Sequence, residues 1–178
     1  MSRRPSSLRA LGPGTILGAA LALGAAGVEA SWQVDTEAVP ESPRTVPVAR
    51  VANESGHSLR IYEDAGNRVH ALFTIRGGFD TLDPAACPTI RVDRRRPERL
   101  TYEGGRCLLE PKRAQFTLGK VGEPVERTLR QFLNGSRVVF RYRLAGGAYR
   151  ETGFTLHRSK HALYTAIPTL AAELGEPQ

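Results

Sequence analysis

The stretch that decides the fold runs from Cys87 to Cys107 and reads C-P-T-I-R-V-D-R-R-R-P-E-R-L-T-Y-E-G-G-R-C. Its ends are the only two cysteines of the chain, and each adjoins a short apolar run, residues 90–92 on one side and 108–109 on the other. An arginine-rich turn at 94–97 separates the two halves. The pattern predicts two neighbouring strands joined by one disulfide, with most other strands added on either side.

The first 30 residues have the pattern of a secretory signal peptide. Three arginines precede an uncharged run at 15–27, and Val28-Glu29-Ala30 offers a cleavage site before Ser31. A membrane anchor is the alternative, but a run of 13 residues is short of the roughly 20 that a bilayer requires. We therefore expect residues 31–178 to form one domain with no transmembrane segment. The expected location is the periplasm, and association with the outer membrane and secretion are the alternatives.

Export would place the two cysteines in an oxidising compartment. In an oxidising compartment, a pair of cysteines is expected to form a disulfide. Closing the loop between Cys87 and Cys107 would stabilise the fold by about 3 kcal/mol in the chain-entropy model. A reactive thiol pair is the alternative, but the sequence has no C-x-x-C motif.

Two regions alternate between apolar and polar residues around a short turn, which is typical of β-hairpins. Residues 58–63 and 68–76 flank the turn at 64–67, and residues 137–144 and 148–156 flank a glycine-rich turn. In the second hairpin a two-residue loop would place Arg143 opposite Arg150, a destabilising like-charge pair. A three-residue loop instead places Arg141 opposite Glu151, and we favour this register.

The remaining segments complete a mainly β chain. Further short strands are expected at 31–35, 48–52, 89–93, 105–110 and 113–118, and residues 36–47, with three prolines, are expected to form a loop or irregular edge. Helical spacing indicates one short amphipathic helix at 124–133 and a helical C-terminal tail at 159–174, interrupted near Pro168. The fold class is therefore an antiparallel β-sandwich or partly closed barrel with one short packed helix and a helical tail.

The chain is strongly basic. It has 25 basic and 18 acidic residues, and 22 of the basic residues are arginine. Removing the signal peptide takes away three arginines and Glu29, which leaves 22 basic and 17 acidic residues and a net charge of +5. A GC-rich genome is one explanation of the arginine bias. The functional explanation is a surface for anionic partners.

No catalytic or metal-binding motif stands out. His157 and His161 have a spacing that could hold zinc on one helical face, but no third ligand follows. Asp80 and Asp83 supply too few oxygens for calcium. Ser136 lacks the glycines of a nucleophile elbow, and the double glycines flank strands rather than open a helix. We therefore expect no catalytic residue, no metal and no cofactor.

Arginines form the one candidate site, in two groups. The first group lies in and around the arginine-rich turn at 94–97 and consists of Arg91, Arg94, Arg95, Arg96 and Arg99. The outer face of the second hairpin carries Arg137, Arg141 and Arg143, with Arg150 on the return strand. If the groups converge they form an anion-binding patch, with Tyr102 or Tyr149 as stacking partners. If they do not, each is a solvated outer face.

The order of these features resembles a family. After the signal peptide come Trp-x-Val at 32–34, Ile-Arg-Val-Asp at 90–93, Gly-x-Cys at 105–107, Leu-Asn-Gly at 133–135, Val-Val-Phe at 138–140 and Gly-Phe-Thr-Leu at 153–156. This is similar to the invasion-associated locus B family of small exported bacterial proteins. Those proteins usually carry more cysteines. The resemblance implies a β-rich envelope protein without known catalytic residues, so it supplies no site residue.

The sequence therefore predicts a non-enzymatic envelope protein that binds a partner. Its arginine-rich faces would contact an anionic lipid or polysaccharide or another envelope protein, and nucleic acid is not an expected partner of an exported chain. The alternative is an envelope enzyme or enzyme inhibitor whose site is assembled from distant residues. A deep pocket with His57, His70 or His157 beside a carboxylate would favour the enzyme, and an arginine-lined face would favour binding.

Overall fold

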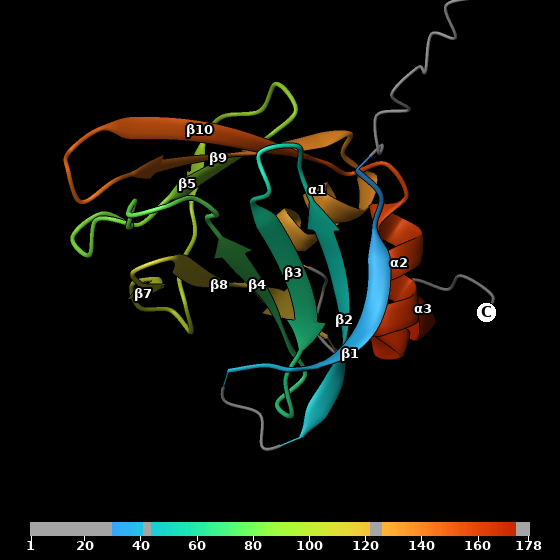
Figure 1. The fold of residues 1–178 in the computed structure, drawn as a ribbon. Coiled ribbons are helices and arrows are strands. Elements are labelled where there is room, and N and C mark those ends of the chain that lie inside the picture. Colours follow the sequence, from blue (N-terminus) through green and yellow to red (C-terminus); the bar gives the residue numbers. More distant parts are fainter. Residues whose placement is uncertain (1–29, 41–43, 122–125, 174–178) are drawn as a thin grey trace, which may run out of the picture.

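The computed structural model describes residues 30–40, 44–121 and 126–173, so nearly all of the predicted signal peptide and the start of the predicted helix at 124–133 lie outside the described residues. Figure 1 shows the arrangement of the elements. The strands are β1 Gln33–Ala38, β2 Thr45–Ala52, β3 Ser58–Glu63, β4 Arg68–Thr74, β5 Thr89–Val92, β6 Glu98–Arg99, β7 Leu108–Glu110, β8 Arg113–Lys120, β9 Arg137–Arg143 and β10 Tyr149–Thr155. The helices are α1 Arg127–Asn134, α2 Ser159–Ala166 and α3 Pro168–Glu173.

Two antiparallel sheets make up the body of the protein. The six-stranded sheet has the order β1-β2-β3-β4-β8-β7, and the four-stranded sheet has the order β10-β9-β5-β6. Apolar rows of both sheets face each other across one core, which is the arrangement of a β-sandwich. The predicted mainly β fold is confirmed, and the described strands do not close into a barrel.

Both predicted hairpins are present with their expected inner rows. In the β9–β10 hairpin Arg141 lies opposite Glu151 and Val138 lies opposite Phe154, which confirms the three-residue loop. In the β3–β4 hairpin the alternating residues Leu59, Ile61 and Phe73 are fully buried. Alternation therefore specified both the strands and the faces that they turn to the core.

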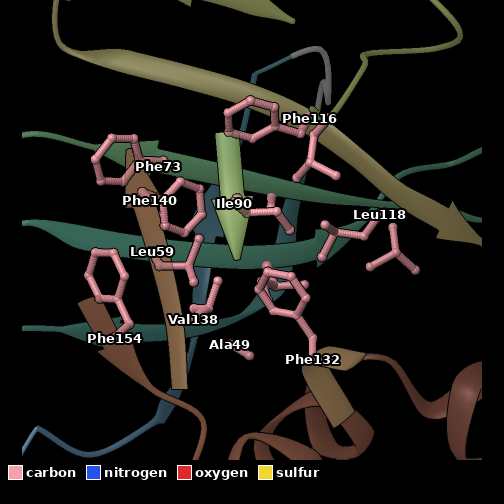
Figure 2. Packing of buried hydrophobic residues seen from close by; sticks show 14 of the residues in the cluster. Ala49, Leu59, Phe73, Ile90, Phe116, Leu118, Phe132, Val138, Phe140 and Phe154 are labelled. Carbon is pink, nitrogen blue, oxygen red and sulfur yellow. The ribbon is translucent and has the colours of Figure 1, made fainter. Parts of the chain in front are cut away.

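The centre of the core is a cluster of aromatic rings contributed by both sheets (Figure 2). Phe140 of β9 stacks on Phe73 of β4 with 4.6 Å between ring centroids. Phe116 of β8 lies 6.1 Å from Phe140, and Phe154 of β10 lies 5.8 Å from it. Aromatic rings bury a large apolar area and dominate core energetics. Because Phe140 contacts rings of both sheets, it packs the two sheets together.

The three helices cover the core beside the four-stranded sheet (Figure 1). Helix α1 buries Leu129, Phe132 and Leu133, while α2 packs against β1, β2 and β3. The Ser159 hydroxyl donates a hydrogen bond to the Phe132 carbonyl oxygen at 2.8 Å and thereby ties α2 to α1. The tail is interrupted at Pro168 as predicted, since this residue begins α3.

The disulfide is present, but the strands that it joins are not neighbours as predicted. Cys87 and Cys107 are bonded, with their Cα atoms 5.9 Å apart. Cys87 precedes β5 of the four-stranded sheet and Cys107 precedes β7 of the six-stranded sheet. The bond therefore links the two layers of the sandwich. The sequence pattern could not distinguish these cases, because both place two cysteines beside short strands.

Residues 36–47 were predicted as a loop or irregular edge, and β1 is indeed the edge strand of the six-stranded sheet, but the loop itself is shorter than 36–47. Strands β1 and β2 extend into it from both sides, so that Thr36 pairs with Pro47 and Ala38 pairs with Thr45. The structure thus places one of the three prolines inside a strand, which is tolerated near a sheet edge.

Candidate anion-binding groove

The outward rows of the four-stranded sheet carry most of the predicted arginines. Because side chains alternate along a strand, the neighbours of buried Phe140 and Tyr142 point away from the core. The strand registers place four outward residues side by side across the sheet, namely Glu151 of β10, Arg141 of β9, Thr89 of β5 and Arg99 of β6. The next row pairs Tyr149 with Arg143.

A hollow of about 710 Å³ opens over this end of the face. We call it the arginine groove. Strands β5, β6, β9 and β10 form its floor, and the segments on either side of the disulfide contribute to its wall. Its lining consists of Ala85, Ala86, Cys87, Thr89, Arg99, Leu100, Thr101, Gly105, Arg106, Arg141, Tyr142, Arg143 and Tyr149.

The four groove arginines differ in their partners. The Arg143 guanidinium forms an ion pair with Asp83 at 3.2 Å, and Arg106 donates to the Ala85 carbonyl oxygen at 2.9 Å. The Arg141 guanidinium lies 4.9 Å from the centroid of the Tyr149 ring. Within the described part of the chain, neither Arg99, Arg106 nor Arg141 has a carboxylate oxygen within 4 Å.

This arrangement suits an anion. Guanidinium groups donate paired hydrogen bonds whose geometry matches phosphate and carboxylate oxygens. The Tyr149 ring has the Arg141 guanidinium on it and the Arg143 guanidinium 5.9 Å from its centroid. Cation–π attraction to this ring therefore orients both side chains. Arg99, Arg106 and Arg141 form no ion pair with any described residue, although Glu151 lies opposite Arg141 in the sheet. Cations gathered around one concave surface attract negative charge more strongly than separate surface arginines would.

The other predicted arginines lie elsewhere. Arg91 and Arg137 share the same outer face but line a separate hollow of about 330 Å³ together with Glu151. Residues 94–96 form an exposed turn beyond Val92, at the opposite end of β5 from Cys87. Arg150 pairs with Tyr142 and so belongs to the row that faces the other way. Of the predicted arginines, the structure therefore brings Arg99 of the first group together with Arg141 and Arg143 of the second.

Sequence reasoning did not assign Arg106 to the site, and it grouped Arg99 with the turn. Arg99 lies in β6, which has only two residues and hence no alternation to recognise. Arg106 adjoins Cys107, and its position depends on the bond between the two sheets. Of the two predicted stacking partners, Tyr149 lies in the groove, whereas the Tyr102 ring stacks on His70 with 5.2 Å between centroids.

A His–carboxylate pair is the feature that best matches the enzyme alternative. His70 Nε2 lies 2.9 Å from Asp64 Oδ2, and the imidazole lies between the rings of Tyr62 and Tyr102. However, only 1% of the His70 surface is exposed, so a substrate could not reach it. The pair anchors the β3–β4 turn, where Asp64 also accepts hydrogen bonds from the backbone N–H groups of Gly66 and Arg68.

His57 and His157, the other two histidines considered for the enzyme alternative, also lack the expected setting of a catalytic base. His57 Nδ1 accepts a hydrogen bond from the Arg76 N–H at 2.8 Å, and its Nε2 lies 3.4 Å from the Tyr142 hydroxyl. Burial lowers the pKa of His57, and burial raises the pKa of Tyr142. His157 lines a hollow of about 280 Å³ whose other described residues include Arg158 and no carboxylate.

Asp64 provides a prediction for stability at acid pH. Burial by itself would raise the pKa of the Asp64 carboxyl, but hydrogen bonds from His70 and from the Arg68 and Gly66 N–H groups outweigh it and hold the pKa below its ordinary value. The ionised carboxylate thus stabilises the folded state fully above the unfolded pKa of about 4, and this contribution is lost as pH falls through the folded pKa.

We expect Asp64→Asn to remove this titration. In urea unfolding, the difference in unfolding free energy between the wild-type chain and Asp64→Asn should shrink as pH falls from about 4 to about 2. Glu110→Gln, at an exposed ion pair with Arg113, is the control and should show a much smaller change. A difference for Asp64→Asn that stays constant over this range would contradict the assignment.

Comparison with known proteins adds no assignment to these observations. No family model, curated protein or solved structure matches the chain. Among the described residues, none of the helices is both long enough and apolar enough to cross a membrane.

Proposed function

We propose that the protein is an exported, non-enzymatic binding protein of the bacterial envelope that holds a phosphate-bearing lipid or polysaccharide component in the arginine groove. The observation that carries this proposal is the set of three arginines, Arg99, Arg106 and Arg141, that line one groove without a carboxylate partner among the described residues. Each can donate paired hydrogen bonds to phosphate oxygens.

The location in the envelope is part of the same proposal. It is supported by the signal-peptide pattern at 1–30 and by the presence of a disulfide, which oxidising compartments favour. We likewise propose membership of the invasion-associated locus B family. The mainly β fold is compatible with the β-rich envelope protein which that resemblance implies.

Direct binding to a soluble phosphorylated probe tests the proposal. A bis-phosphorylated glucosamine disaccharide presents sugar phosphates without acyl chains, and its affinity can be measured by isothermal titration calorimetry. Replacing Arg99, Arg106 and Arg141 by glutamine should weaken binding at least about tenfold for each arginine, because hydrogen bonds to charged groups contribute about 1.5–3 kcal/mol. Wild-type affinity should fall with added salt.

The chain offers a control that is matched in charge. Replacing Arg94, Arg95 and Arg96 by glutamine removes the same three charges from an exposed turn at the opposite end of β5. This control variant should keep nearly wild-type affinity. Equal losses in the two triple variants would mean that net charge, and not the groove, attracts the probe, and the proposal would fail.

A further inference from the structure

Large apolar side chains are exposed at one end of the protein. Phe79 is 104% exposed, Tyr149 is 58% exposed and Leu108 is 43% exposed, and they are the exposed large apolar residues of the described chain. Phe79 lies in the loop between β4 and β5, Tyr149 begins β10 after the β9–β10 turn, and Leu108 begins β7. Tyr149 also lines the arginine groove.

Hydrogen bonds connect these segments at that end. The Ala145 N–H in the β9–β10 turn donates to the Thr81 carbonyl oxygen at 2.9 Å. The Leu82 N–H donates to the Pro111 carbonyl oxygen, which lies between β7 and β8, at 2.7 Å. Figure 1 shows the β4–β5 loop beside the β9–β10 turn. The aromatic side chain of Phe79 and the mouth of the groove therefore belong to the same end of the sandwich.

The loop that carries Phe79 is braced. The Lys112 ammonium donates to the carbonyl oxygens of Gly77 and Gly78. Gly77 has a φ of +136°, a conformation that favours glycine. Next to this braced backbone the Phe79 side chain is fully exposed, so none of the described residues covers its ring.

The charges around this end of the protein indicate what kind of partner it can bind. Cations are supplied by the groove arginines and by Lys112, while Asp83 is already paired with Arg143. Asp80 is the exposed carboxylate of the same loop. Aromatic side chains prefer the boundary between headgroups and acyl chains, and basic residues beside them bind anionic headgroups.

We propose that this end of the protein docks on the surface of an anionic lipid bilayer, with Phe79 entering the headgroup boundary while the groove arginines bind lipid phosphates. The inference rests on the proposed function for its electrostatic half. Its apolar half rests on Phe79 alone, and a single weak signal gives only marginal membrane binding, whereas two acting together give a more stable association.

Fluorescence locates the contact. Phe79→Trp is titrated with vesicles of phosphatidylglycerol and phosphatidylethanolamine, and the signal of the native Trp32, recorded on the wild-type chain, is subtracted. We expect a blue shift and quenching by brominated acyl chains. Ala65→Trp, in the exposed turn at the other end of β4, is the control and should show neither. Phosphatidylcholine vesicles should produce little change.

Affinity separates this inference from the proposed function. Phe79→Ala should weaken vesicle binding roughly tenfold, as expected for removing a side chain that is largely buried in an apolar phase, and should leave binding of the soluble disaccharide unchanged. The Arg99, Arg106 and Arg141 triple variant should weaken both. Disaccharide binding without vesicle binding, or equal vesicle binding by wild type and Phe79→Ala, would overturn the docking inference alone. Failure to bind the disaccharide would overturn the proposed function.

Discussion

Phe140→Ala is expected to lower the free energy of unfolding by about 3–5 kcal/mol, the usual cost of removing a buried phenylalanine ring. Phe140 is fully buried. Its ring contacts Phe73 and Phe116 of the six-stranded sheet and Phe154 of its own sheet. The cavity would therefore open at the point where the two sheets meet. A loss of this size is a large share of the about 5–15 kcal/mol that stabilises a typical domain.

Urea unfolding followed by circular dichroism measures this loss. Phe79→Ala is a matched control because it makes the same chemical change at a side chain that is 104% exposed. It should alter the unfolding free energy by no more than about 0.5 kcal/mol. If both variants lost the same stability, the stacked rings could not be the centre of the core.

Loss of the disulfide is expected to have the second largest effect. The double variant Cys87→Ala and Cys107→Ala should lower the unfolding free energy by about 3 kcal/mol, because the unfolded chain regains the entropy of the loop between two bonded cysteines whose sequence separation is 20. Here the bond also holds the four-stranded sheet to the six-stranded sheet at the wall of the arginine groove. The double variant should therefore bind the phosphorylated disaccharide more weakly at temperatures where it is still folded.

Reduction provides the control for the disulfide. A thiol reductant should lower the urea midpoint of the wild-type chain to that of the double variant and should not change the double variant. Unchanged stability of the wild-type chain after complete reduction would show that the bond contributes nothing to the fold.

The sequence predicted the parts of the fold that depend on local patterns. Alternation identified both long hairpins and their inner rows, as with Leu59 and Ile61 in β3. The cost of placing Arg143 opposite Arg150 selected the correct loop length of the second hairpin. Pro168 marked the break in the tail. Each of these signals acts between residues that are close in sequence or paired in one hairpin.

The features that the sequence did not predict depend on contacts between distant segments of the chain. The outer face of β3 and β4 buries Tyr62, His70 and Leu72, although alternation treats that face as solvated. Val39 and Val48 pack there with Tyr62 and Leu72, so β1 and β2 are needed to see the burial. The arginine groove has the same origin. Its floor joins strands far apart in sequence, and Arg106 lines it from a position next to Cys107, whose disulfide joins the two sheets.

Mapping the bound disaccharide by nuclear magnetic resonance tests the central claim most directly. Amide resonances of the isotope-labelled protein are followed during titration with the bis-phosphorylated glucosamine disaccharide. We predict that the largest shifts fall on residues that line the arginine groove, above all Thr89, Arg99, Arg106, Arg141 and Tyr149. Shifts concentrated on the turn at 94–96, or spread evenly over the basic surface, would contradict the claim that the groove is the binding site.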